Sequence, residues 1–155
     1  MAAHEELIVR NKDFTDNATP SGNSVAADVM LKLSKITGNE RYERYATKVL
    51  ALIASQARRY PQGFGRALAA MEFAIAPVKE IVLVNDTKVD LANEVWSQYL
   101  PSKVVVNLNE DLKRDDLPLL EGRTSINGGP TAYVCESFVC SRPVTTAEEL
   151  SEELM

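Results

Sequence analysis

A change of pattern at Ala76-Pro77 constrains the fold more than any other feature of the sequence. Before it, apolar residues recur at helical spacing, and after it they gather in short β-branched runs. The residue before a proline avoids the helical region, so a helix is expected to end here. We therefore predict an α+β chain with two units, a helical segment over residues 1–77 and a small α/β domain over residues 78–155.

Three antiparallel helices are predicted in the first unit. They cover about residues 22–37, residues 42–55, and a stretch from 61 or 63 to 75. The connection between the first two is only a few residues long, which makes them antiparallel neighbours. The side chains expected to be buried in the first two helices are Val25, Ala26, Met30, Leu31, Leu33 and Ile36, and Tyr42, Tyr45, Ala46, Val49, Leu50 and Ile53. In the third helix the apolar positions are Leu68, Met71, Phe73 and Ile75.

Polar residues at the expected helix ends fit caps. Ser21, with Ser24 as the alternative, can accept a hydrogen bond from the first turn of the first helix, and Gly38 fits its C-terminal stop. A terminal helix is expected near residues 147–154, where Thr146 and Glu149 have the spacing of a capping box.

The second unit reads as strands around one short helix. Residues 80–84 and 103–107 are runs typical of strands buried on both faces, and residues 90–99 between them are helical. Strand, helix and strand in this order form a βαβ unit with parallel strands. Residues 131–135 are a third strand, and residues 138–140 can lengthen the sheet. We predict a short, mainly parallel three-stranded sheet, with three leucines pinning the long 108–130 loop to the core (Leu117, Leu119 and Leu120).

Bulk properties exclude several classes of function. The 155 residues carry a net charge of −5, which argues against a general nucleic-acid binder because such a protein needs a basic face. No apolar run approaches the roughly 20 residues that span a bilayer, so no membrane is expected as a partner. The N-terminus lacks the pattern of a signal peptide, and there are two cysteines. These features predict a cytoplasmic protein in a reducing compartment.

Polar chemistry is concentrated between Asn11 and Ser24. Asp13 and Asp16 in this stretch have a functional and a structural interpretation. In the functional one they are a general acid and base, or they bind the hydroxyls of a sugar. In the structural one they are turn and capping residues. The same alternatives apply to Ser21 and Asn23, because capping explains most of their pattern.

The remaining reactive side chains give weak signals. Cys135 and Cys140 do not have the spacing of a redox dithiol or of a zinc site. Buried, inert thiols are the favoured interpretation, and a disulfide or regulatory pair is the alternative. His4 is the only histidine, which removes a multi-histidine metal site and a Ser-His-Asp triad. The strand-turn-helix at residues 80–99 lacks the glycines of a dinucleotide site. We predict no metal and no cofactor.

Two stretches carry a resemblance to a known family. They comprise residues 4–10, 12–13, 16 and 20–26 near the N-terminus, and residues 128–134, Cys135, Cys140 and Pro143 near the C-terminus, with residues 117–122 fitting as well. Over nearly its whole length, the chain resembles the closing section of the thioredoxin-domain-containing protein family related to spermatogenesis-associated protein 20.

The resemblance implies a larger parent protein. Its members carry a thioredoxin-like domain, then an (α/α)6 barrel similar to the N-acylglucosamine and cellobiose 2-epimerases, then a small α/β domain. This chain would hold the final barrel helices and the α/β tail. Loops at one end of such a barrel line a sugar-sized pocket, and Asp13, Asp16, Ser21 and Asn23 would be part of that lining.

We expect the chain to be a C-terminal fragment of such a protein without independent catalysis, because two or three helices cannot close a barrel. One alternative is a carbohydrate-processing, epimerase-like enzyme in which Asp13 and Asp16 transfer protons. Another is a protein-interaction module that docks through the α/β tail and its two cysteines. Helix faces left without neighbours would be exposed, which favours self-association. A small sugar is the expected ligand in the full-length context.

Overall fold

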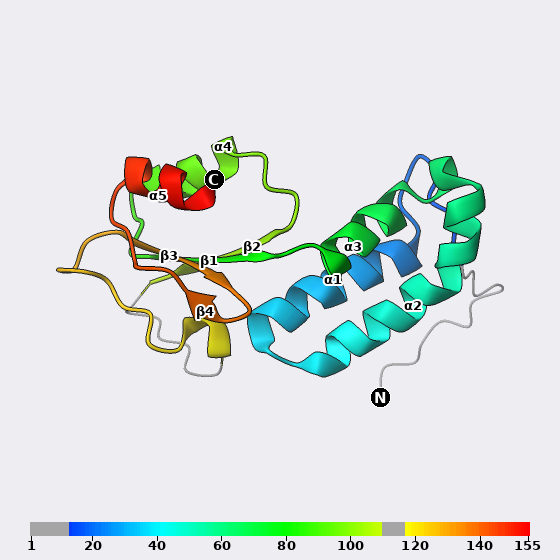
Figure 1. The fold of residues 1–155 in the computed structure, drawn as a ribbon, viewed down its shortest axis with the longest axis horizontal. Coiled ribbons are helices and arrows are strands. Elements are labelled where there is room, and N and C mark those ends of the chain that lie inside the picture. The colour runs from blue at the N-terminus through cyan, green and yellow to red at the C-terminus, as the bar shows by residue number, and fades with distance from the viewer. Residues whose placement is uncertain (1–12, 110–116) are drawn as a thin grey trace, which may run out of the picture.

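A layer of helices at one end of the molecule is joined to a sheet at the other (Figure 1). The computed structural model describes residues 13–109 and 117–155. His4, the resemblance at residues 4–10 and 12, and residues 110–116 of the predicted 108–130 loop lie outside the described residues. The observed architecture is α+β, as the sequence predicts.

Helices α1 (Gly22–Thr37), α2 (Glu40–Arg59) and α3 (Gly65–Ile75) form the helical layer, with a 3-10 turn η1 (Pro61–Gly63) before α3. The predicted caps of α1 are confirmed. The Ser21 hydroxyl accepts the N–H of Ser24 at 3.1 Å, and Gly38 is left-handed with φ 66°. Helix α2 continues four residues beyond its predicted end at residue 55, and both of its last two residues are arginines. Basic residues at a helix C-terminus are favourable for the helix dipole.

The buried face of α1 is not the predicted one. Its buried residues are Ser24, Ala27, Asp28, Leu31 and Ser34. Of the predicted stripe only Leu31 is buried, while Val25 is 38% exposed. The helix packs against α2 and α3 through small residues, which allow close approach of the backbones, and its larger apolar side chains lie beside that contact. On α2 the predicted burial of Tyr45 is also wrong, since it is exposed. Of the apolar positions of α3, Phe73 is buried, whereas Leu68 and Ile75 are exposed.

The sheet has four strands in the order β2-β1-β3-β4. They are β1 (Lys79–Val84), β2 (Lys103–Leu108), β3 (Thr131–Glu136) and β4 (Val139–Cys140), with α4 (Asp90–Ser97) between β1 and β2. The βαβ unit is confirmed, because β1 and β2 are parallel.

The prediction of a mainly parallel three-stranded sheet is wrong. Strand β3 runs antiparallel to β1, and β4 returns antiparallel to β3 as a hairpin. A parallel strand needs a crossover, usually a helix, to carry the chain back. The described part of the connection before β3, residues 117–130, contains only the short 3-10 turn η3 (Pro118–Leu120). Within that turn Leu119 and Leu120 are buried, as predicted.

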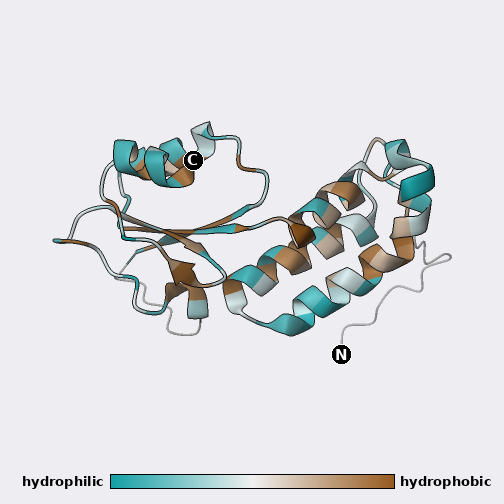
Figure 2. Ribbon diagram, in the orientation of Figure 1, coloured by the Kyte–Doolittle hydropathy of each residue, from teal (hydrophilic) through white to brown (hydrophobic). Residues whose placement is uncertain are grey.

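Strand β1 is the centre of two hydrophobic cores. Ile81 and Leu83 face α4 and the terminal helix α5 (Ala147–Leu154), whereas Val82 and Val84 face the other side of the sheet. On that second side one continuous core runs from the three helices through η3 to the strands. Figure 2 shows the apolar strands between these flanking layers. The change from helices to strands falls between residues 75 and 79, but whether the two units fold separately stays a prediction.

The terminal helix α5 has the predicted cap. Thr146 accepts the N–H of Glu149 at 3.2 Å, and the Glu149 carboxylate reaches back to the N–H of Thr145 at 3.1 Å. Its apolar residues Leu150 and Leu154 pack on the sheet beside α4. None of the helices in the described part of the chain combines the length and apolar character that crossing a bilayer requires.

Candidate functional site

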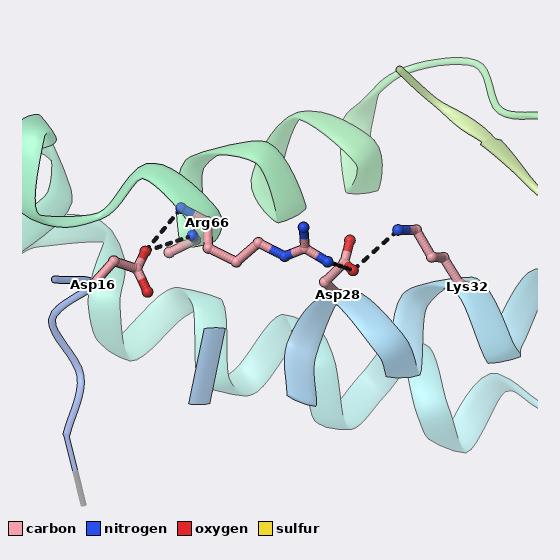
Figure 3. A network of polar contacts seen from close by, with 5 residues as sticks. Asp16, Asp28, Lys32 and Arg66 are labelled. Atoms are coloured by element: carbon pink, nitrogen blue, oxygen red, sulfur yellow. Dashed lines mark hydrogen bonds and ion pairs between the residues drawn. The ribbon is translucent and has the colours of Figure 1, made fainter. Parts of the chain in front are cut away.

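Asp16 lies in the loop before α1 and binds the start of α3 (Figure 3). Its Oδ2 accepts the backbone N–H groups of Arg66 at 2.8 Å and Ala67 at 3.1 Å. Its Oδ1 accepts the N–H of Ser21 at 2.9 Å. The backbone N–H of Asp16 in turn donates to the carbonyl of Gly63 at 2.8 Å. The first N–H groups of a helix have no partner within the helix, so Asp16 supplies the cap that α3 lacks from its own flanking residues.

These contacts keep the Asp16 carboxylate ionised. Burial by itself raises the pKa of Asp16. The hydrogen bonds from the Ser21 and Ala67 N–H groups, the Ser24 hydroxyl and the Arg66 N–H outweigh it and lower the pKa below its ordinary value. The negative charge also lies at the positive end of the α3 dipole.

The structure brings only some of the predicted site residues together. Ser21 contacts Asp16 through its N–H, and its buried hydroxyl lies 2.8 Å from that of Ser24. Asn23 donates its amide to Asp13 at 2.7 Å, but to the backbone carbonyl rather than the carboxylate. Asp13 itself is exposed. This geometry matches the turn and capping interpretation, and the catalytic role of Asp13 and Asp16 stays a prediction.

A second carboxylate, Asp28, was missed by the sequence reasoning. Its side chain is 8% exposed, and its Oδ2 binds Lys32 Nζ at 3.0 Å and the guanidinium of Arg66 (Figure 3). Arg66 therefore contacts Asp16 through its backbone and Asp28 through its side chain. The available signal was an acid four residues before a lysine, inside the helix and next to Ala27. This network joins α1 to α3.

The two cysteines form a disulfide, so the favoured expectation of inert thiols is wrong. Cys135 on β3 and Cys140 on β4 are directly paired in the hairpin, which places both sulfurs on one face of the sheet. The sequence does not show this because it does not specify the two-residue turn between them. The alternative of a disulfide is confirmed.

Glu80 is the most deeply buried acid of the described residues and lies beside this disulfide. It is 0% exposed on β1, directly opposite Cys135. One carboxylate oxygen accepts the N–H of Phe138 at 2.8 Å. Burial raises the pKa of Glu80 more than the Phe138 N–H and the charge of Lys35 lower it, and Glu136 adds to the rise. The sequence reasoning treated Glu80 only as the end of a strand.

The described residues do not include a group of three or more His, Cys, Asp or Glu side chains that could hold a metal ion. The chain is therefore an α+β protein with two polar sites that connect its elements. One is a carboxylate network between helices, and the other is an acid beside a disulfide.

Comparison with known proteins identifies homologues of this chain. The chain is homologous to spermatogenesis-associated protein 20, with 33% identity to the Homo sapiens protein over 156 residues and 31% to the Rattus norvegicus protein over 157. An uncharacterised Caenorhabditis elegans protein is 28% identical. Each match covers 96% of this chain and 20–21% of the relative, so the chain spans about a fifth of the length of these relatives. No family model matches the chain. No solved structure matches it either.

Proposed function

We propose that this chain works as one structural segment of a larger protein of the spermatogenesis-associated protein 20 type, without catalysis of its own. The observation that carries the proposal is the span of the homology, which takes in 96% of this chain but a fifth of the relative. In that protein the helices α1 to α3 would be the last helices of an epimerase-like barrel, and the sheet would be its C-terminal α/β domain.

The state of the carboxylates supports a structural role. A general base needs a free lone pair within hydrogen-bond reach of the proton that it removes. Three backbone N–H groups bind the two oxygens of Asp16, and two cations bind Oδ2 of Asp28, so the contacts of both carboxylates are to α1, to α3 and to the residues just before α1. Their geometry holds α1, α3 and the preceding loop together, which is what a segment of a larger helical assembly requires.

Exposed apolar side chains on the helical layer support a missing neighbour. Val29 on α1 is 45% exposed, Leu52 on α2 is 71% exposed and Ile75 at the end of α3 is 87% exposed. Single exposed apolar residues are normal, whereas a contiguous apolar patch marks a surface that another element covers, and we propose that these three residues contribute to such a surface. We propose that the rest of the larger protein covers them, and that the isolated chain self-associates through these faces.

Turnover and binding of sugars by the purified chain test the absence of catalysis. We expect no conversion of N-acylglucosamine or cellobiose and no saturable heat of binding in calorimetry. Saturable turnover that disappears in both Asp13→Asn and Asp16→Asn would instead establish the carbohydrate-processing alternative. Circular dichroism of each variant shows whether a loss of activity is a loss of fold.

Sedimentation of the chain over a range of concentrations tests the covered helix faces. We expect the average mass to rise with concentration, and we expect Leu52→Glu to reduce this rise. The matched control is Ala54→Glu, which places the same charge at an exposed position of the same helix that carried no large apolar side chain. A chain that stays monomeric at all concentrations, or equal effects of both variants, contradicts self-association through this face.

A further inference from the structure

The β3–β4 hairpin holds its disulfide at the edge of the sheet. Cys135 and Cys140 are register partners, and the turn between them consists of Ser137 and Phe138, both with positive φ (51° and 64°). Strand β4 is the last strand of the sheet, so Cys140 lies on an unprotected edge. The described part of the chain has no free cysteine, so this pair is its only thiol chemistry.

The acid beside the pair is placed by the sheet register. Glu80 is the β1 partner of Cys135, so their side chains share one face, and the Cβ atoms of directly opposed residues lie about 5 Å apart. The Cys135 sulfur therefore has Cys140 on one side and the Glu80 carboxyl on the other. While Oε2 of Glu80 accepts the Phe138 N–H, its buried Oε1 has no hydrogen-bond partner among the described residues. A buried oxygen without a hydrogen-bond partner costs free energy, and the cost is larger when the carboxylate is charged. The neutral, protonated form of Glu80 is therefore favoured.

The two sulfurs differ in access. Cys135 is 1% exposed, whereas Cys140 on the edge strand is only partly buried. A small thiol can therefore approach Cys140 from solvent, while Cys135 faces the interior and Glu80.

We propose that Cys135–Cys140 is a thiol–disulfide exchange site for dithiol reductants, in which Glu80 gives a proton to the sulfur of Cys135 on reduction. The proposal goes beyond the structural role proposed above and does not depend on it.

The exchange balances in two steps. A thiolate of the dithiol attacks Sγ of Cys140, the Cys135–Cys140 bond breaks, and a mixed disulfide forms between Cys140 and the reductant. Cys135 leaves with the electron pair and takes the proton of the Glu80 carboxyl. The second thiol of the reductant then loses its proton to solvent and attacks the reductant's own sulfur in the mixed disulfide. Cys140 is released as a thiolate, which takes a proton from water. The dithiol is oxidised to a disulfide, the protein disulfide is reduced to two thiols, and Glu80 regains its proton from solvent.

The surroundings of Glu80 favour its protonated form, which is the form that can donate a proton. Burial, the largest influence, raises the pKa of Glu80, and Glu136 on β3 raises it further. The Phe138 N–H in the hairpin turn and Lys35 on α1 act in the opposite direction without reversing it. A carboxyl group with a raised pKa still carries its proton where an ordinary glutamate has lost it, so it can protonate a leaving thiolate.

Reduction of the folded chain by dithiothreitol tests the proposal. Aliquots are quenched with acid, alkylated and weighed by mass spectrometry over a series of pH values, and each rate is divided by the thiolate fraction of dithiothreitol. For the unmutated chain we expect this normalised rate to fall as pH rises through the pKa of Glu80. For Glu80→Gln, whose amide oxygen can still accept the Phe138 N–H, we expect a flat profile that is about 100-fold lower at the acidic end.

The matched control is Glu136→Gln, which removes a neighbouring negative charge but leaves the proton donor. We expect its normalised profile to keep the fall of the unmutated chain, moved to lower pH. A flat profile in the unmutated chain overturns the proposal, and that measurement needs no variant. Identical profiles for Glu80→Gln and the unmutated chain overturn it as well, since they assign Glu80 to holding the hairpin turn alone.

Discussion

Asp16 and Glu80 are two carboxylates that each tie separate parts of this chain together, and their environments are opposite. Asp16 joins the N-terminal loop to α3, and three backbone N–H groups bind it. Glu80 joins the sheet to the hairpin turn, and one backbone N–H binds it in a fully buried position. The pKa of Asp16 is lowered and that of Glu80 is raised. The comparison shows that the number of hydrogen-bond donors to a carboxyl group, weighed against its burial, decides whether the charged or the protonated form is favoured.

The difference separates a structural group from a reactive one. A carboxylate that accepts several backbone N–H groups stabilises the elements that supply them, and its charged form is favoured over its protonated form. A buried carboxyl with one unoccupied oxygen has its protonated form favoured and can give that proton away. Sequence reasoning placed the chemistry at Asp16, whereas the arrangement around Glu80 is better suited to proton transfer.

The largest expected effect in this comparison comes from removing the Asp16 carboxylate. Asp16→Ala leaves the first N–H groups of α3 and the N–H of Ser21 without acceptors. Loss of a cap costs up to about 2 kcal/mol, and a hydrogen bond to a charged group is worth about 1.5–3 kcal/mol. We expect the free energy of unfolding in urea to fall by about 2–3 kcal/mol.

A more conservative change at the same position sharpens this prediction. Asp16→Asn keeps one acceptor oxygen and loses the charge, so we expect about half the loss of Asp16→Ala. If Asp16→Ala lowers the free energy of unfolding by less than about 0.5 kcal/mol, the range of an ordinary surface substitution, Asp16 does not act as the cap of α3.

Local features of both regions were predictable from the sequence. The caps at Ser21, Gly38 and Thr146 depend on residues within one turn, and each is found as predicted. The strands of the βαβ unit were also predicted within one or two residues, because a β-branched run and a breaker are local signals.

Features that depend on distant residues were not predictable. Asp16 and its partner Arg66 are 50 residues apart, and no periodicity links a loop to the start of a later helix. The direction of β3 depends on a connection of more than 20 residues without strand signal. One signal for Glu80 was present and went unused: with a period of two, it shares the face of Val82 and Val84, which a buried strand places in the core.

A glycine at the meeting point of the two regions gives the next effect in size. Gly38 is left-handed, and a Cβ added there would lie 3.4 Å from Pro118 Cγ and 3.8 Å from the Phe138 ring at the tip of the hairpin. We expect Gly38→Ala to lower the free energy of unfolding by about 1–2 kcal/mol, because a side chain in the left-handed region is strained. Urea unfolding measures it.

The matched control is Gly63→Ala, where the added Cβ meets open space and φ is not positive. There we expect no loss or a gain of about 0.5 kcal/mol from the reduced freedom of the unfolded chain. Equal effects of the two variants would mean that the conformation of Gly38 does not hold α1, α2 and the hairpin in place.

The smallest effect, and the most direct test of the comparison, is the pH dependence of the two carboxylates. The folded pKa of Asp16 is lowered, so its contribution is complete above the unfolded value of about 3.9 and is lost as pH falls through the folded pKa. The folded pKa of Glu80 is raised, so its contribution is complete below about 4.3 and is lost as pH rises through the folded pKa.

The stability of each neutral variant, subtracted from that of the unmutated chain at every pH, isolates these contributions. We expect the difference for Asp16→Asn to increase as pH rises from the folded pKa of Asp16 to about 4, and the difference for Glu80→Gln to decrease as pH rises above about 4.3. Urea unfolding at fixed salt measures both series. Slopes of the same sign would show that Glu80 is held as a carboxylate like Asp16, and the hairpin would then lack the proton that exchange at Cys135 requires.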